Sequence, residues 1–171
     1  MSWFKTILSF LIVSASLAGC GFKPMYGQRT GDAVLSQMAA VHVSPMRGLL
    51  GVEMYNQLRD NLTPAGKFIA ARYQLDLEFR ANRDALITAK DSQVRRFNLV
   101  IDATYSLFDI ASGRLLTSGA ASTITNYNVV ESSNFGTSAA EEAAHRRGVR
   151  QIGEQVIWAL SVFFKQQVSD T

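Results

Sequence analysis

Few residues of this chain have side chains that could do covalent or metal chemistry. The sequence of 171 residues holds one cysteine and two histidines, which excludes an internal disulfide and a metal site built on several such ligands. Glu142 and His145 have the Glu-x-x-His spacing of half a di-iron site, but the second pair and the extra carboxylates are missing. The sequence also contains no phosphate-binding loop, Gly-x-Ser-x-Gly motif or dinucleotide fingerprint. We therefore predict a protein that is not an enzyme and uses no metal or cofactor.

The composition is that of one globular domain. Hydrophobic residues make up 47% of the chain and charged residues 18%, enough to form an ordinary core. The 17 basic and 14 acidic residues give a net charge of only +3. A nucleic-acid-binding domain usually has a stronger and more clustered basic face, so we expect no nucleic-acid partner.

The single cysteine, Cys20, directly follows an apolar segment. Met1–Lys5 carries one positive charge, and Thr6–Ala18 is mostly apolar but shorter than the roughly 20 residues that span a bilayer. These features are typical of a secretory signal peptide. Leu17-Ala18-Gly19-Cys20 resembles the bacterial lipobox, in which cleavage precedes the cysteine and its thiol is acylated. An ordinary signal peptide with an incidental cysteine is the alternative.

The lipobox implies a signal peptide over residues 1–19 and a mature chain that begins with acylated Cys20. Two or more acyl chains, palmitate among them, would hold the protein stably on a membrane. Residue 21 is Gly rather than Asp, which by the enterobacterial sorting rule indicates the outer membrane. We expect a lipidated tether over residues 20–37 and one α+β domain over residues 38–168.

Two hydrophobic periodicities define that domain. Arg72–Arg80 alternates polar and apolar residues, as a strand with one buried face does. Leu50, Met54, Leu58 and Leu62 recur every four residues, as in an amphipathic helix. A second helical stripe lies near the C-terminus and consists of Val149, Ile152, Val156, Leu160 and Phe163. Beside it, Gly148 and Gly153 favour close packing on the sheet or a bend.

The predicted elements follow the order β-α-β-β-β-α. The strands are expected near residues 39–44, 72–80, 94–109 and 115–127, and the helices near residues 49–62 and 138–167. A turn is expected over Asp109–Arg114, because Asp, Ser and Gly favour tight turns. The strand–helix–strand start predicts a crossover, and the last three strands predict an antiparallel meander. We therefore expect an α+β fold, with a four-stranded sheet and two helices packed on one face.

The start of the mature chain also resembles a known family. Cys20-Gly21-Phe22-Lys23-Pro24-Met25-Tyr26-Gly27 is similar to the mature N-terminus of LptE, the lipopolysaccharide-assembly lipoprotein family, in its alphaproteobacterial form. Asn56–Arg59, Tyr105–Gly119 and Gln155–Leu160 fit the family more loosely. The resemblance implies a protein that lies inside the lumen of the outer-membrane β-barrel LptD. It further implies that the protein aids barrel assembly and binds lipopolysaccharide on its way to the cell surface.

Two surfaces are candidates for these roles. A basic group near the connection between the second and third strands could bind the phosphates of lipid A, although it could equally protect a solvated hairpin end. It consists of Arg80, Arg83, Lys90, Arg95 and Arg96. On the last helix, Trp158 and Val162 lie away from the apolar stripe and could anchor a partner, unless a loop of the same domain covers them. Arg146, Arg147 and Arg150 are expected to lie on a solvated helix face near Glu141 and Glu142.

The resulting expectation is a lipoprotein at the periplasmic side of the outer membrane that binds and plugs an LptD-type barrel and helps lipopolysaccharide reach the surface. One alternative is an auxiliary lipoprotein of an ABC-type phospholipid-trafficking system, which differs in its partner. A periplasmic enzyme is a further alternative, and it would need a pocket lined by titratable groups, which Asp76 and Glu78 on one strand do not provide.

The basic group near the strand connection gives a direct prediction. Charge reversal at Arg95 and Arg96 should weaken lipopolysaccharide binding more than charge reversal at Arg146 and Arg147, because the second pair has acidic neighbours on its own helix. A binding assay with purified variants measures this. Equal losses for the two pairs would remove any special role of the hairpin.

Overall fold

The computed structural model describes residues 28–63, 69–86, 94–130 and 134–169. Cys20, the motif over residues 20–27 and Lys90 lie outside these ranges. The chain divides into two compact units, Met1–Asp32 and Ala33–Thr171, and the second contains every strand and most of the described helices. In chain order the described elements are α2 (Gln28–Ala39), β1 (Val41–Val43), α3 (Leu49–Leu62), β2 (Tyr73–Leu86), β3 (Val94–Asp109), β4 (Leu115–Val130) and α4 (Asn134–Ser169).

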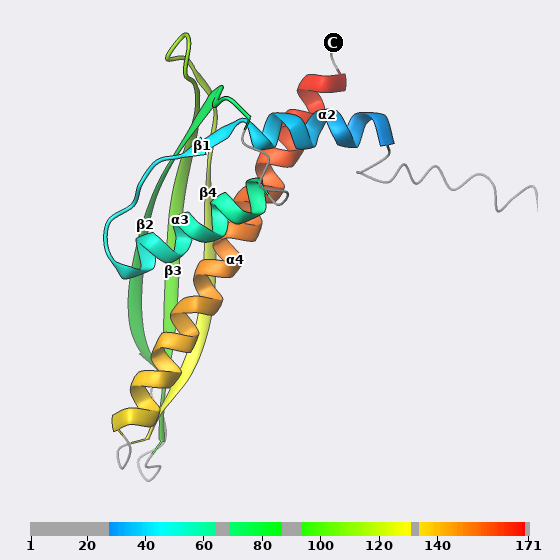
Figure 1. Ribbon diagram of the computed structural model, residues 1–171. Helices are drawn as coiled ribbons and strands as arrows, with labels where there is room; N and C mark the ends of the chain where they lie inside the picture. The colour runs from blue at the N-terminus through cyan, green and yellow to red at the C-terminus, as the bar shows by residue number, and fades with distance from the viewer. Residues whose placement is uncertain (1–27, 64–68, 87–93, 131–133, 170–171) are drawn as a thin grey trace, which may run out of the picture. The chain divides into compact units, whose positions relative to one another are not determined.

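The four strands form one sheet in the order β1-β2-β3-β4 (Figure 1). β1 is short and pairs in parallel with the start of β2, with Val41 opposite Tyr73 and Val43 opposite Leu75. β2, β3 and β4 pair antiparallel, as the meander prediction requires. The parallel pair is joined through α3, so the predicted crossover is confirmed.

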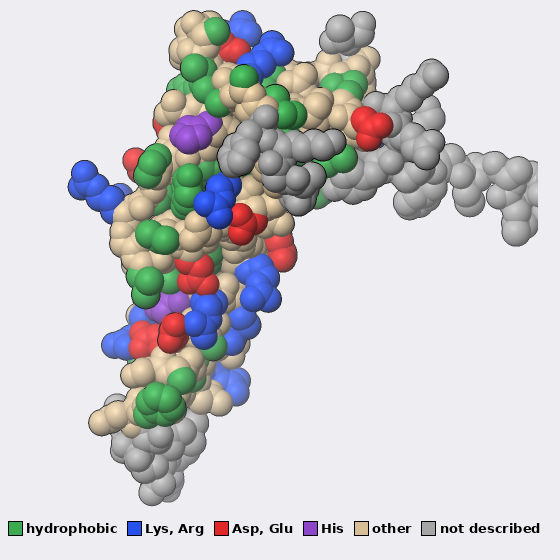
Figure 2. Space-filling view, in the orientation of Figure 1, with side chains coloured by type: hydrophobic (Ala, Val, Ile, Leu, Met, Phe, Trp, Pro, Cys, Tyr) green, Lys and Arg blue, Asp and Glu red, His purple; other side chains and the backbone are tan. Residues whose placement is uncertain are grey.

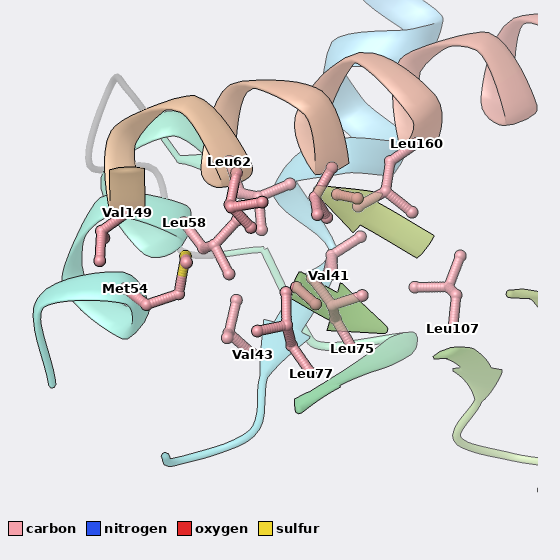
Figure 3. Packing of buried hydrophobic residues seen from close by; sticks show 14 of the residues in the cluster. Val41, Val43, Met54, Leu58, Leu62, Leu75, Leu77, Leu107, Val149 and Leu160 are labelled. Carbon is pink, nitrogen blue, oxygen red and sulfur yellow. The ribbon is translucent and has the colours of Figure 1, made fainter. Parts of the chain in front are cut away.

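Apolar residues of the sheet and the helices meet in one core. On β2 the buried positions alternate through Tyr73, Leu75 and Leu77, as the period-two pattern predicts. On α3 the predicted stripe is buried at Met54, Leu58 and Leu62. Figure 3 shows Met54, Leu58 and Leu62 of α3 close to Leu75 and Leu77 of β2, together with Val149 and Leu160 of α4.

α4 covers the sheet along a stripe of small and apolar residues. Its buried side includes Val149, Ile152, Val156 and Leu160, which confirms that part of the predicted stripe. The stripe continues to Phe164, which is fully buried, whereas the predicted Phe163 is only partly buried. Positions four apart drift slowly around a helix of 3.6 residues per turn, and this drift brings Phe164 onto the buried face.

The described residues contain a third helix, where the sequence predicts two. α2 begins at Gln28, so part of the segment that was expected to be an extended tether is helical. Val34 and Met38, four residues apart, are buried in the core, and the Tyr73 hydroxyl donates a 2.7 Å hydrogen bond to Gln37 Oε1. Two apolar residues are too few to give a clear periodic signal in the sequence. The contact of Val34 and Met38 with the core is what stabilises the helix.

Three elements are longer than the sequence predicts. β2 continues beyond Arg80 to Leu86, β4 continues to Val130, and α4 begins at Asn134 rather than at residue 138. In β2 the alternation stops after Arg80, but Ala81 to Leu86 still pair with β3 in unbroken register. Pairing with a neighbouring strand therefore extends β2 beyond its local hydrophobic pattern.

The turn between β3 and β4 has the predicted chemistry. The Ser112 backbone N–H and hydroxyl both donate hydrogen bonds to Asp109 Oδ1, at 2.8 and 2.7 Å. These bonds lower the pKa of the Asp109 carboxyl below its ordinary value. Gly113 has a φ of +67°, a conformation that glycine adopts without strain. The turn thus fixes the register of the long β3–β4 pair.

Two glycines let α4 approach its neighbours closely. A Cβ atom at Gly148 would overlap the side chain of Ile101, a fully buried residue of β3. A Cβ atom at Gly153 would lie 2.8 Å from Nε2 of Gln57, on α3. Of the two alternatives that the sequence leaves open for these glycines, the structure supports close packing.

These contacts predict different effects for two alanine substitutions on one helix. Gly148→Ala should lower the free energy of unfolding by roughly 1–3 kcal/mol, because Ile101 has little room to move in the core. Gly153→Ala should change it by less than about 1 kcal/mol, because Gln57 is flexible and alanine favours helix formation. Urea unfolding of both variants measures the difference, and similar losses would contradict this packing.

Candidate binding surfaces

The predicted basic group does not form one cluster. Lys90 lies outside the described residues, and of Arg95 the structure gives only its backbone position, opposite Val129. Arg80 lies opposite Asp102, whereas Arg96 lies opposite Leu86. These positions are six residues apart along β2, which corresponds to roughly 20 Å. Arg80 and Arg96 are therefore exposed cations at separate places on the sheet.

Arg83 belongs to a contact between the sheet and α4. Its guanidinium lies 3.7 Å from a carboxylate oxygen of Glu141 and 5.1 Å from the ring centroid of Phe97. Phe97 in turn stacks on Tyr127 at 5.8 Å between centroids. Each contact contributes little to stability, because the ion pair is partly exposed. Together the contacts attach the start of α4 to β2, β3 and β4. Arg83 is thus less available to an external phosphate than Arg80 or Arg96.

Tyr127 is a buried polar group within this contact. Its side chain is 4% exposed, and its hydroxyl has no hydrogen-bond partner among the described residues. Burial raises the pKa of the Tyr127 hydroxyl above its ordinary value, because the phenolate would lose its hydration. The neutral hydroxyl is therefore the form that the folded protein favours.

Trp158 and Val162 lie on the side of α4 that follows the outer edge of β4. Arg147 donates a 2.8 Å hydrogen bond to the backbone carbonyl of Asn126, and Gln155 donates a 3.1 Å hydrogen bond to that of Ser122. Between them Gln151 accepts a hydrogen bond from the Thr123 hydroxyl. Trp158 and Val162 continue this row by helical spacing. Trp158 is 62% exposed, so no loop within the described residues covers it.

The side chains of Arg146 and Arg147 have partners, whereas Arg150 is bonded through its backbone. Arg146 forms a 2.6 Å ion pair with Glu142, as expected from their spacing of four residues. Arg147 is bonded to β4, and the backbone carbonyl of Arg150 accepts a 2.9 Å hydrogen bond from Gln57. Figure 2 shows acidic and basic side chains interspersed on the part of the surface where α4 begins. This agrees with the expected solvated helix face.

Two hollows were not predicted from the sequence. One, of about 640 Å³, lies between α3 and the first half of α4, with exposed Leu49 and Val52 on one wall and His145 on the other. The other, of about 940 Å³, lies between the Pro45–Leu50 segment and the middle of β2 and β3. In the sequence, only Leu49 and Val52 point to the first hollow, because they are apolar but lie outside the buried stripe of α3.

The geometry around Glu142 and His145 gives no catalytic arrangement. Glu142 is paired with Arg146 rather than with the imidazole, and the buried Nδ1 of His145 has no hydrogen-bond partner among the described residues. Within the described ranges no group of three or more His, Cys, Asp or Glu side chains could hold a metal ion. No described helix is long and apolar enough to cross a membrane.

The described residues form an α+β domain in which helices cover one face of a four-stranded sheet. Solved structures share this fold. A protein of Caulobacter crescentus CB15, assigned as a lipoprotein, matches with a TM-score of 0.64 and 19% identity over 78% of this chain and 96% of that chain. Rare lipoprotein B of Shewanella oneidensis matches with a TM-score of 0.53 and 14% identity over 71% and 92% of the two chains.

The sequence itself places the chain in a family. Residues 38–160 match the LptE family, described as lipopolysaccharide-assembly, and the chain belongs to that family. An uncharacterized protein of Rickettsia prowazekii (strain Madrid E) is 27% identical over 123 residues, which cover 72% of this chain and 75% of that protein. The predicted family is thus confirmed by a match over the folded domain, whereas the N-terminal motif over residues 20–27 lies outside the matched residues.

The burial of Tyr127 predicts a pH effect. A hydroxyl whose pKa is raised in the folded state contributes stability below its unfolded pKa of about 10 and loses that contribution as the pH rises further. Relative to the wild type, Tyr127→Phe should therefore gain stability between pH 8 and pH 11, because the variant has no phenol whose ionisation is opposed by burial. Urea unfolding at the two pH values measures this, and a constant difference would show that the hydroxyl is not buried.

Proposed function

We propose that this protein is an outer-membrane lipoprotein that binds an LptD-type β-barrel, aids its assembly and helps to transfer lipopolysaccharide to the cell surface. The observation that carries the proposal is the family match over residues 38–160. The lipobox at Cys20 supports attachment to the periplasmic side of the outer membrane by acyl chains. The protein would thus act by binding.

The exposed side of α4 is the proposed contact with the barrel. Trp158 presents a large aromatic surface, and Val162 adds an apolar neighbour one helical turn away. Aromatic residues dominate the binding energy of many interfaces, because they bury much apolar area with little loss of side-chain entropy. The backbone below this row is fixed by the hydrogen bonds between α4 and β4. The anchor therefore needs little rearrangement on binding.

Lipopolysaccharide is the second proposed ligand, through phosphate contacts with Arg80, Arg83, Lys90, Arg95 and Arg96. Among the described members, Arg80 and Arg96 fit this role better than Arg83, because Arg83 already contacts Glu141 and Phe97. Arg96 Nε donates a 3.2 Å hydrogen bond to Asn128 Oδ1, which holds the guanidinium at the surface. A guanidinium held in this way still has donors for a phosphate.

Co-purification tests the barrel contact. The protein carries a C-terminal tag, is extracted from outer membranes in mild detergent, and its partners are identified by mass spectrometry. A stoichiometric large β-barrel is expected. Trp158→Ala should lower the affinity for that barrel roughly 30-fold, the effect of losing a hot-spot residue worth about 2 kcal/mol.

Phe135→Ala is the matched control, since Phe135 is 86% exposed on the same helix and lies outside the proposed row. The Phe135→Ala variant should co-purify with as much of the barrel as the wild type does. An equal loss for the two variants would contradict the role of Trp158. An ABC-type transporter as the stoichiometric partner would instead assign the protein to phospholipid trafficking.

A further inference from the structure

One end of the sheet brings three segments of the chain together. The Arg72 N–H donates a 2.9 Å hydrogen bond to the carbonyl of Ala40, directly after α2, and the Arg72 carbonyl accepts a 2.9 Å hydrogen bond from the Ile110 N–H. Ile110 lies in the turn between β3 and β4 (Figure 1). Residues 69–72 and 109–115 therefore form one surface, which we call the turn end.

The turn end exposes apolar side chains. Ile110 is 47% exposed, Leu115 is 50% exposed and Ile69 is 45% exposed. The backbone of the turn is already hydrogen-bonded, since the Gly113 N–H donates a 2.8 Å bond to the Asp109 carbonyl. The turn end therefore offers a partner side chains rather than free backbone groups.

Two arginines accompany these apolar side chains. Arg114 is exposed in the turn, and the Arg72 side chain is 63% exposed. Asp109 is the acidic group among them: its carboxylate lies 4.0 Å from Arg72 Nε and accepts two hydrogen bonds from Ser112. Figure 2 shows basic and hydrophobic side chains next to one another at the top of the view. Two arginines and one aspartate give the turn end a net positive charge.

The length of chain between Cys20 and the turn end limits how far apart they can be. Cys20 precedes Gln28 by eight residues, which span at most about 29 Å in any conformation. The 12 residues of α2 add about 18 Å, and the residue after α2 is bonded to Arg72 of the turn end. β3 has 16 residues, so the other end of the sheet lies roughly 50 Å farther away. An anchor at Cys20 thus keeps the turn end close to a membrane.

We propose that the turn end rests on the phospholipid bilayer that holds the acyl chains of Cys20. Binding to a membrane surface grows with the apolar area that enters the headgroup region and with the attraction of basic residues to anionic lipids. The exposed isoleucines and leucine supply the first contribution, and Arg72 and Arg114 supply the second. Because the acyl anchor already holds the chain at the bilayer, even a weak surface contact is sufficient.

This inference rests on the acylated Cys20 of the proposed function and does not depend on the barrel. It gives the anchored domain an orientation, because β2 begins and β3 ends at the turn end. The strands would lead away from the bilayer. The start of α4, which follows the other end of β4, would then lie away from the lipid.

Fluorescence quenching by spin-labelled lipid tests this contact. Ala111 in the turn and Ala139 near the start of α4 are both exposed, so Ala111→Cys and Ala139→Cys place the same thiol-reactive dye at the two ends. Acylated Cys20 has no free thiol, so each variant carries one dye. The acylated full chain is reconstituted in vesicles of phosphatidylethanolamine and phosphatidylglycerol that contain spin-labelled phosphatidylcholine.

The dye at position 111 should lose most of its fluorescence to the spin-labelled lipid, and the dye at position 139 should keep it. Adding Ile110→Asn to the Ala111→Cys chain should lower the ratio of lipid-bound to free turn roughly fivefold. That factor is the equivalent of about 1 kcal/mol for the exposed half of an isoleucine side chain. Ile124→Asn is the matched control, because Ile124 is an exposed isoleucine in β4 outside the turn end. It should leave the quenching unchanged.

Three results would overturn the inference: no quenching at position 111, equal quenching at positions 111 and 139, or equal effects of Ile110→Asn and Ile124→Asn. Circular dichroism checks that the variants fold. If Ile110→Asn does not fold, Arg114→Gln tests the same contact. Arg96→Gln is then its control, since Arg96 is exposed at the other end of β3.

Mass spectrometry of Cys20 and the co-purification experiment separate this inference from the proposed function. Quenching at position 111 of an acylated chain that co-purifies with no barrel would support the membrane contact and contradict the proposed barrel. A co-purifying barrel together with an acylated chain that is not quenched at position 111 would do the reverse. An unacylated Cys20 would contradict the proposed anchor and overturn this inference with it.

Discussion

The packing of α4 on β3 and β4 is the contact on which the rest of this structure depends. Alternating strands have one apolar face that must be covered, and a helix of 36 residues covers it along most of the sheet. The approach is close because Gly148 has no side chain to separate the helix from Ile101. The same closeness lets Arg147 and Gln155 reach the backbone of β4, and it places Glu141 near Arg83. The protected edge of the sheet and the fixed position of Trp158 both follow from this one contact.

The two faces of the sheet differ in what covers them, and so do its two edges. One sheet face is covered by helices, while the other carries exposed polar and charged residues such as Glu78, Arg80 and Arg96. One edge is occupied by α4 side chains, and among the described residues no strand pairs with the other edge beyond Leu75. The exposed Trp158 and the polar face are the surfaces that the proposed binding would use, and the chain belongs to a lipopolysaccharide-assembly family.

The fold could be predicted largely from the sequence, because its main elements have clear periodicity. The stripe of α3 and the alternation at the start of β2 are properties of neighbouring residues, so both were visible without tertiary information. α2 was missed because only Val34 and Met38 carry its contact with the core. The end of β2 was missed because its residues pair with β3 without an apolar pattern of their own. The separation of Arg80 from Arg96 depends on strand register, which sequence spacing alone does not reveal.

A cryo-electron microscopy structure of the tagged protein, extracted from the outer membrane with its partner, tests the central claim most directly. The account predicts that the partner is a large β-barrel and that Trp158 and Val162 contact its inner wall. A structure in which the protein lies outside the lumen, or in which the Trp158 side of α4 faces solvent, would contradict it.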